Sequence, residues 1–363
     1  MRLNWRRFDF LLMGATLLLI IYGIAMVYSA TLGVPNYENY ALRQAIYALI
    51  GLVILVLTAA FDYRLLTSLQ WPIYAVILLA LGAVAIIGQA RGGTAGWFDT
   101  GLVLIQPSEI AKVLFAVVFA QYLSSHHDDL HRPQWVVGAF VLMGLPVALI
   151  YLQPDLGTAI VLMVIGVIML FAADLPWGYI LATVAAGVLA APIAWANMQD
   201  YMRQRIMIFL DPASDPDASF NIAQALISIG NGGWLGKGFT RGSQSQLHFL
   251  RVRYADFIFS VTAEELGFVG AVILILLLLV VLWRLFSIAD QARDYFGRLI
   301  VVGVTAMILF QAMVSIGMNL GLFPVTGITL PFISYGGSSL LTLMFGIGLA
   351  QSVAMRNRKI EFD

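Results

Sequence analysis

The chain has 363 residues, of which 61% are hydrophobic and only 11% are charged, and its mean hydropathy is +0.89. Soluble domains carry roughly 25% charged residues, so this composition predicts a polytopic membrane protein and excludes a large soluble domain. The formal net charge is zero, which gives no support for nucleic-acid binding. The chain has no Cys, which excludes disulfides, thiolate catalysis and zinc-thiolate sites.

Ten apolar runs are each long enough to span a bilayer as a helix. The runs lie near residues 11–29, 44–61, 71–90, 108–124, 134–151, 156–173, 177–198, 257–283, 299–321 and 338–355. The first run is too long for a signal peptide and is predicted as the first transmembrane helix. Residues 91–107 are Gly-rich and predict a loop or a re-entrant piece. No repeat or linker divides the chain, so residues 1–363 are predicted to form a single integral membrane domain.

The distribution of basic residues predicts the orientation in the membrane. With the N-terminus in the cytoplasm, most Arg and Lys of the short loops fall on the cytoplasmic side, and the C-terminus lies there as well. The long loop 199–255, between helices 7 and 8, then lies outside. It holds six basic residues against the trend, and binding of an anion would explain them. They are Arg203, Arg205, Lys237, Arg241, Arg251 and Arg253.

Asp256 directly precedes the eighth apolar run, which also carries Glu264 and Glu265. Ionisable groups at membrane depth are costly and usually face a cavity, a partner or a reaction, so Asp256 is the leading candidate for chemistry. Eight residues separate Asp256 from Glu264, about 12 Å along a helix. The Glu pair is therefore too distant to form an acid–base pair with Asp256. We expect it deeper in the membrane, hydrogen-bonded to neighbouring helices.

Two further helix starts carry acidic residues beside a proline. Glu109 and Lys112 share a helix face after Pro107, and the pattern fits equally a structural ion pair and a site where Lys112 meets an anionic headgroup. Asp155 follows Pro154 at the start of the sixth run, where capping of the helix is favoured over catalysis. All three acidic starts fall on the outer side and together could line one outward cavity.

Three other segments carry candidate binding residues. Arg203 and Arg205 lie beside an apolar segment and suit either phosphate binding or snorkelling to lipid headgroups. Lys237 follows a Gly-rich stretch that resembles a phosphate-binding loop only superficially, because the required spacing fails. Residues 221–230 have the apolar spacing of an amphipathic helix on the membrane or over the cavity.

The segment 324–339 is rich in Pro, Gly and hydroxyl side chains, and irregular backbone at membrane depth usually lines a wet cavity. It predicts a binding wall near Asp256, with Ser334, Ser338 and Ser339 as candidate contacts. His126 to His131 carries metal-ligand residue types, but a solvated loop on the opposite side is favoured.

Five motifs in order make the chain resemble the shape, elongation, division and sporulation (SEDS) family, over nearly its whole length. The motifs are Gln106-Pro-Ser-Glu109 with Lys112; Gln153-Pro-Asp-Leu-Gly-Thr158; Tyr201-Met-Arg-Gln-Arg205 with Phe209-Leu-Asp-Pro212; Asp256-Phe-Ile-Phe-Ser260 with Glu264-Glu-Leu-Gly267; and Pro324-Val-Thr-Gly327 with Leu330-Pro-Phe-Ile-Ser-Tyr-Gly-Gly-Ser-Ser339. One departure is Tyr254-Ala255 before Asp256, where members often have His-Thr.

The resemblance implies an all-α protein of about ten transmembrane helices, similar to the GT-C class. It also implies a peptidoglycan glycosyltransferase that polymerises lipid II into nascent glycan outside the membrane during elongation. The implied partners are a class B penicillin-binding protein and other membrane proteins of the elongation complex.

For this reaction we expect Asp256 to act as general base. Lys112, Arg203 and Arg205 are candidate cations for the leaving pyrophosphate, and a divalent ion (Mg²⁺ or Mn²⁺) could share that work. Glu109 and Asp155 are expected to shape the cavity. A flippase for lipid-linked precursors is the alternative, but its usual repeated halves are missing from the sequence. A scaffold would not need five motifs of ionisable residues.

Overall fold

The computed structural model describes residues 5–34, 37–91, 94–99, 104–196, 198–247 and 249–357. Each of the ten predicted apolar runs forms a helix. These helices are α1 (Phe10–Thr31), α2 (Tyr40–Ala60), α3 (Gln70–Ile87), α4 (Pro107–Ser125), α5 (Pro133–Leu152), α6 (Leu156–Ala172), α7 (Trp177–Ala196), α11 (Ile258–Asp290), α12 (Tyr295–Asn319) and α13 (Gly337–Met355). The prediction of an all-α polytopic membrane protein is confirmed. Three short 3₁₀ helices, η1 (Trp5–Arg7), η2 (Tyr63–Leu69) and η3 (His127–Asp129), lie beside them.

Seven of the helices in the described part of the chain are long and apolar enough to cross a membrane: α1, α2, α3, α5, α11, α12 and α13. Two more, α6 and α7, are apolar but shorter by this criterion. The remaining predicted span, α4, carries Glu109 and Lys112 and packs against α3, α6, α12 and α13. Neighbouring helices shield its charged side chains from lipid, which is why a helix of moderate hydropathy occupies the interior.

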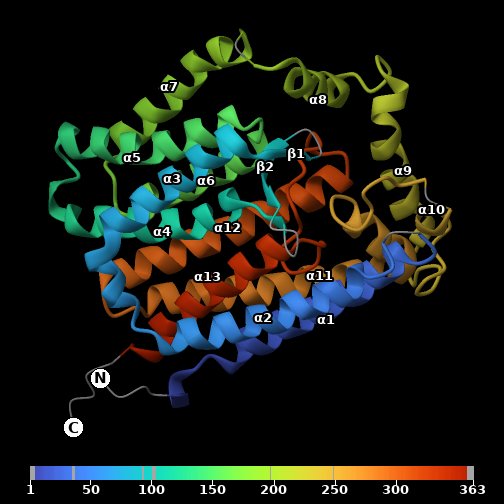
Figure 1. Ribbon diagram of the computed structural model, residues 1–363, viewed down its shortest axis with the longest axis horizontal. Helices are drawn as coiled ribbons and strands as arrows, with labels where there is room; N and C mark the ends of the chain where they lie inside the picture. Colours follow the sequence, from blue (N-terminus) through green and yellow to red (C-terminus); the bar gives the residue numbers. More distant parts are fainter. Residues whose placement is uncertain are drawn as a thin grey trace.

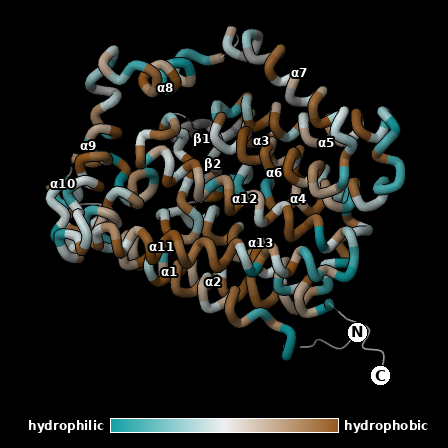
Figure 2. Tube along the Cα trace, turned by 180° about the vertical axis from the view of Figure 1, so that it is seen from behind, coloured by the Kyte–Doolittle hydropathy of each residue, from teal (hydrophilic) through white to brown (hydrophobic). Residues whose placement is uncertain are grey.

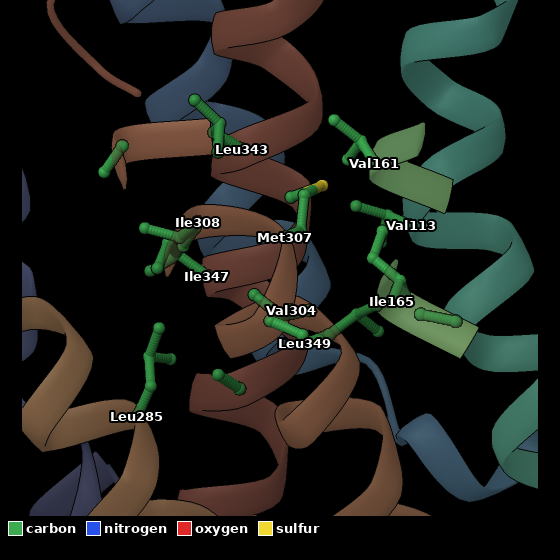
Figure 3. Packing of buried hydrophobic residues seen from close by; sticks show 14 of the residues in the cluster. Val113, Val161, Ile165, Leu285, Val304, Met307, Ile308, Leu343, Ile347 and Leu349 are labelled. Atoms are coloured by element: carbon green, nitrogen blue, oxygen red, sulfur yellow. The ribbon is translucent and has the colours of Figure 1, made fainter. Parts of the chain in front are cut away.

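The core of the bundle lies where α4, α6, α12 and α13 meet. Val113, Ile165, Met307 and Ile347 interdigitate there, as Figure 3 shows. Since lipid is as apolar as these side chains, close packing rather than the hydrophobic effect holds such helices together. Gly348 of α13 illustrates this packing, because a Cβ at that position would lie 2.8 Å from the Leu55 carbonyl oxygen of α2. The two helices run side by side along their length.

The helix η1 and the end of α13 lie at the same end of the bundle, which we call the inner end (Figure 1). The helices α9 (Pro216–Gly232) and α10 (Ser243–Gln246) lie at the opposite, outer end, and α7 leads to α8 (Asp200–Leu210) along one edge of the molecule. The lipid-length helices are largely hydrophobic, while hydrophilic segments gather at the two ends (Figure 2). Because successive helices alternate in direction, α4, α6 and α11 all start at this same end of the bundle, whereas the side of the membrane that it faces stays a prediction.

The segment predicted as a plain loop or re-entrant piece contains a small antiparallel sheet of order β1-β2-β3. Its strands are β1 (Gln89–Arg91), β2 (Thr94–Asp99) and β3 (Leu104–Ile105). Gln89 pairs with Trp97, and Phe98 pairs with Ile105. The sheet leads directly into Pro107 and thereby fixes the start of α4 at the outer end. Short strands with Gly between them give too weak a periodic pattern to be predicted.

The amphipathic helix expected over residues 221–230 is part of α9, which packs on α11. The buried face of α9 is not the face that carries its large apolar side chains. Ala225 and Ser228 are fully buried, whereas Leu226 is 45% exposed. Small side chains allow a close approach to α11: a Cβ on Gly232 would lie only 1.9 Å from the Ala263 carbonyl oxygen.

The helix α11 bends at Gly267, which has φ 66° and ψ −166° and separates two helical segments. The part after the bend, residues 268–290, has roughly the 20 residues needed to span a bilayer. Glu264 and Glu265 both precede this bend, and their depth in the membrane stays a prediction. They accept hydrogen bonds from the outer loop, including those from the Gln244 amide to Glu264 at 2.8 Å and from the Thr240 amide to Glu265 at 3.0 Å.

Candidate active site

Asp256 lies in a turn at the outer end, immediately before α11. Its amide donates to the Val252 carbonyl at 3.1 Å, and its own carbonyl accepts from Asn319 Nδ2 at 2.8 Å. The side chain is partly exposed, and within the described residues its carboxylate forms no hydrogen bond or ion pair. The backbone is thus held from two sides while the carboxylate stays available to a substrate.

The environment of Asp256 makes it a stronger base than an ordinary aspartate. Burial raises the pKa of this carboxyl to about 6, and the positive charge of Arg205 acts in the opposite direction. Burial disfavours the ionised form because surrounding protein replaces water. A carboxylate with this pKa is still mostly ionised at neutral pH, yet it accepts a proton more readily than usual, which suits a general base.

Backbone strain flanks Asp256 on two segments. Val252 and Phe332 adopt left-handed conformations, with φ 51° and 67°. Bulky residues rarely occupy this region, and such conformations cost about 1–3 kcal/mol each. The Val252 turn is closed by the amides of Ala255 and Asp256, which both donate to its carbonyl. The strained turn fixes the direction in which the Asp256 side chain points away from the backbone.

The predicted Pro/Gly/Ser wall does lie beside this turn. Ser334 Oγ donates to the Ala255 carbonyl at 2.7 Å and accepts from the Leu330 amide at 2.9 Å. The Tyr335 amide donates to the Tyr254 carbonyl at 2.9 Å. Ser334 thus joins the wall to the Asp256 turn, and its hydroxyl supports that turn from the side of the wall.

The other two candidate serines lie nearer to the starts of α4 and α13. Ser338 Oγ accepts from the Gln106 amide at 3.1 Å, and Ser339 Oγ lies 3.0 Å from Thr329 Oγ1. The wall also packs closely against α6. A Cβ placed on Gly157 of α6 would lie only 2.9 Å from the Thr326 carbonyl oxygen, so a glycine is needed there. The wall therefore bridges α4, α6 and the Asp256 turn.

A second cluster of charged residues joins α4 and α6. Lys112 Nζ donates to Glu109 Oε1 at 2.7 Å, and these side chains are 1% and 10% exposed. Asp155 caps α6 through the Thr158 amide at 3.0 Å and accepts from Gln106 Nε2 at 3.1 Å. Burial raises the pKa of Asp155, while its bond to Thr158 lowers it. The ion pair and the helix cap, both considered from the sequence, are present.

The helix α8 connects the two acidic regions. The Tyr201 hydroxyl donates to the Pro154 carbonyl next to Asp155. The Arg205 guanidinium lies over the Tyr201 ring at 5.5 Å from its centre, and its charge acts on Asp256. The structure thus brings Arg205, Asp155 and Asp256 to one side of the outer end. Arg205 is the candidate cation that the structure associates with Asp256.

Two other predicted cations are directed elsewhere. Arg203 donates to the Trp195 and Ala196 carbonyls at 3.0 and 2.7 Å, which holds the junction between α7 and α8. Lys237 is exposed, and its amide donates to the Glu264 carbonyl at 3.0 Å, in the loop that covers the bend of α11. In this conformation neither residue is joined to the Asp256 turn by a hydrogen bond.

The Glu264–Glu265 pair holds the outer loop in place, and both side chains are fully buried. Ser29 of α1 donates to Glu265 at 2.6 Å, and Ser245 donates to Glu265 at 3.2 Å through its hydroxyl and to Glu264 at 3.2 Å through its amide. The expected hydrogen bonding to a neighbouring helix is present through Ser29. Most donors, however, come from the loop.

Sequence reasoning missed Asn319 and a tyrosine cluster. Asn319 is fully buried, donates to the Asp256 carbonyl and accepts from Ser260 Oγ at 2.7 Å. Tyr40 and Tyr335 stack with ring centres 4.2 Å apart, and Tyr254 meets Tyr40 edge-on at 5.1 Å. A polar Asn near the end of an apolar run was a usable signal. The tyrosines come from three distant segments and carry no common pattern.

The described residues do not form a site for a resident metal ion, and a divalent ion bound together with the substrate stays a prediction. In the described part of the chain, no group of three or more His, Asp or Glu side chains lies together in a way that could hold an ion. Divalent ions such as Mg²⁺ need several oxygen ligands, which Asp256 alone does not provide. No step below therefore depends on a metal.

The fold defines a polytopic membrane protein with a cluster of acidic and basic residues, including Asp256 and Arg205, at one end of its helical bundle. Residues 9–359 match the FtsW/RodA/SpoVE family, described as cell cycle protein, and the chain belongs to this family. It is 39% identical over 344 residues to the peptidoglycan glycosyltransferase MrdB of Escherichia coli K12, covering 93% of this chain and 90% of that one. Stage V sporulation protein E of Bacillus subtilis is 35% identical over 361 residues, covering 96% and 98%.

Solved structures agree over the whole length of the chain. One, described as structural coordination of polymerization and crosslinking by a peptidoglycan synthase complex, has a TM-score of 0.84 at 33% identity, covering 96% of this chain and 98% of that one. The crystal structure of the rod shape determining protein RodA of Thermus thermophilus has a TM-score of 0.74 at 29% identity, covering 98% and 99%.

Proposed function

We propose that this chain is a peptidoglycan glycosyltransferase that polymerises lipid II during cell elongation, with Asp256 as its general base. The enzyme class follows from the family and its named relatives. The observation that supports the assignment of the base is the Asp256 carboxylate itself. It has no partner among the described residues, its pKa is raised to about 6, and its backbone is held from two sides.

In the proposed reaction the acceptor's sugar 4-hydroxyl attacks C1 of the donor sugar. A glycosidic C–O bond forms as the bond from C1 to the pyrophosphate breaks, and the hydroxyl proton passes to Asp256. Undecaprenyl pyrophosphate leaves with the bonding electrons. A β-1,4 link formed from an α-linked donor implies inversion, so one base and no covalent intermediate suffice.

Arg205 is the favoured cation for the charge that develops on the leaving pyrophosphate. It lies on α8, which spans from Pro154 towards Asp256, and its guanidinium can pair with phosphate oxygens. Lys112 is buried and already paired with Glu109, so we assign this pair, with Asp155, to the shape of the cavity. Contacts of Arg203, Lys237, Ser338 and Ser339 with the substrate, and any Mg²⁺ or Mn²⁺ bound with it, stay predictions.

The chain is a multi-pass membrane protein, and we propose that its termini lie in the cytoplasm and its active site outside. The helix η1 and the end of α13 lie at the inner end, and α11, which Asp256 directly precedes, starts at the outer end, which is consistent with this topology. A solved neighbour from a peptidoglycan synthase complex supports assembly with a penicillin-binding protein. We propose that the partner is a class B transpeptidase within an elongation complex.

Polymerisation of labelled lipid II by the purified chain tests this function, with and without the transpeptidase. A flipping assay on the same liposomes separates the enzyme from the alternative of a precursor transporter. Glycan strands without flipping are expected. Flipping without strands, in the presence of the partner, would instead support transport.

A further inference from the structure

A pocket of about 500 Å³ is lined by residues of η1, α1, α11 and α13 that belong to the inner end of the bundle. The start of α1, the end of α11 and the end of α13 form its wall. Arg6, Arg7 and Arg284 line it, together with Asp9, Ser287 and Gln291. The proposed reaction involves none of these residues, so the pocket needs a separate explanation.

Asp9 makes this wall a rigid junction of three helices. It caps α1 by accepting from the Leu12 amide at 2.9 Å, and its carboxylate accepts from Arg284 Nη2 of α11 at 2.6 Å. Its backbone amide and carbonyl both bond the Gln351 side chain of α13, at 2.9 and 2.8 Å. These contacts fix the positions of two of the pocket's charged groups, Asp9 and Arg284, before any ligand binds.

The charges that line the pocket favour an anion. Among the described residues of its wall, three arginines and one aspartate leave a net charge of 3 − 1 = +2. Arg284 uses Nε and Nη2 on Asp9, while its Nη1 forms no hydrogen bond within the described residues. Guanidinium groups match the oxygens of a phosphate in pairs, and Ser287 and Gln291 add neutral donors.

Aromatic side chains place the pocket at the edge of the lipid. Trp5 and Phe10 are 47% and 73% exposed beside it, and Trp283 and Phe286 of α11 are 59% and 69% exposed. Trp in particular gathers at the headgroup level of a bilayer, where phospholipid phosphates also lie. The Arg284 guanidinium lies 5.3 Å from the centre of the Trp283 ring, so the cationic and aromatic groups are contiguous.

We propose that this pocket binds the phosphate headgroup of an anionic glycerophospholipid in the leaflet at the inner end. Basic pockets between helices are suited to such headgroups. A zwitterionic lipid fits less well, because Asp9, the one carboxylate among the described residues of the wall, is already paired with Arg284 and is not available to an ammonium group. The assignment of this leaflet to the cytoplasmic side rests on the proposed topology, whereas the binding itself does not depend on the glycosyltransferase activity.

Lipid binding to the purified full chain in a neutral detergent tests this proposal. A ligand that binds only the folded state raises the unfolding temperature, and native mass spectrometry counts the retained lipid. Phosphatidylglycerol, phosphatidylcholine and inorganic phosphate are the three probes. We expect phosphatidylglycerol alone to be retained and to raise the unfolding temperature.

A double substitution, Arg6→Gln with Arg7→Gln, should weaken phosphatidylglycerol binding about tenfold or more, which corresponds to ~1.4 kcal/mol or more. Both side chains are exposed, so the fold and the polymerase activity should persist. The matched control is Arg293→Gln with Arg298→Gln, which removes two exposed cations outside the pocket wall and should leave binding unchanged.

Three results would overturn the proposal. Equal retention of phosphatidylcholine would show that charge is not recognised. Equal stabilisation by inorganic phosphate would show a free-anion site rather than a lipid site. Unchanged binding of phosphatidylglycerol by the Arg6/Arg7 variant would place the lipid elsewhere on the protein.

Discussion

Asn319, the last residue of α12, donates from Nδ2 to the backbone carbonyl of Asp256 at 2.8 Å. The same side chain accepts from the amide and hydroxyl of Ser260, at 3.1 and 2.7 Å, in the first turn of α11. One buried amide thus joins the end of α12 to the proposed base and to the helix that follows it. The position of the base depends on α12 as much as on its own segment.

Replacement of Asn319 by Ala should therefore lower kcat more than it changes KM. Three buried groups lose a hydrogen-bond partner, which costs about 1–3 kcal/mol of stability, and displacement of the base slows the chemical step. Steady-state polymerisation and thermal unfolding measure the two effects. Ser315→Ala, one turn away, is the control, because the Ser315 hydroxyl has no hydrogen-bond partner among the described residues. Equal kcat and KM values for the two variants would show that Asn319 does not position Asp256.

The polymerisation rate should depend on a single ionisation near pH 6. Burial raises the pKa of Asp256 to about 6, and only its carboxylate form accepts the proton of the acceptor hydroxyl. At about one pH unit below this value, roughly a tenth of the enzyme remains ionised. The measurement is kcat/KM for lipid II between about pH 5 and pH 8. A rate that stays flat down to about pH 5 would contradict this role.

Arg205→Gln should shift that profile towards higher pH. The positive charge of Arg205 lowers the pKa of Asp256, so its removal raises the pKa and leaves less carboxylate at a given pH. The maximal rate should fall as well, if Arg205 stabilises the leaving pyrophosphate. Arg203→Gln, on the same helix, should leave the profile in place, because Arg203 is bonded to the Trp195 and Ala196 carbonyls. A shift of equal size in both variants would indicate general loosening of α8.

Variants of the Glu109–Lys112 pair distinguish a structural role of this ion pair from a role in substrate binding. Loss of either charge leaves the other buried without a partner, and Glu109→Gln or Lys112→Met should each cost about 3–5 kcal/mol. The double variant should recover most of that stability in denaturant unfolding. Since Lys112 is 1% exposed, we expect activity to recover with it. Recovered stability without activity would instead assign Lys112 to the substrate.

Helix positions followed from the sequence because lipid imposes a length and a polarity on every span. The α7 run, for example, has no detectable cap or charge pattern, yet its apolar length was enough to predict a helix. The sheet before α4 and the bend at Gly267 were not predicted. Both depend on contacts with distant segments, such as the approach of Gly236 N to within 2.3 Å of a Cβ placed on Gly267.

The candidate site was predicted in part, for physical reasons. Asp256 stood out because a lone carboxylate beside an apolar run is costly. The sequence did not distinguish Arg205 from Arg203, because the direction of each side chain is set by the packing of α8 against Pro154 and α7. Asn319 and the tyrosine cluster act through contacts across more than 60 positions of the chain, as the bond from Asn319 to Asp256 shows, and no local pattern encodes such contacts.

The central claim is that the Asp256 carboxylate removes the acceptor proton, and Asp256→Asn tests it most directly. Because the folded pKa lies above the ordinary value of about 3.9, ionisation of this group costs stability as pH rises through about 6. The variant should therefore unfold at or above the native temperature at neutral pH. Purified and supplied with labelled lipid II and the transpeptidase partner, it should form no glycan strands. A folded Asp256→Asn enzyme that polymerises at the native rate would contradict the account.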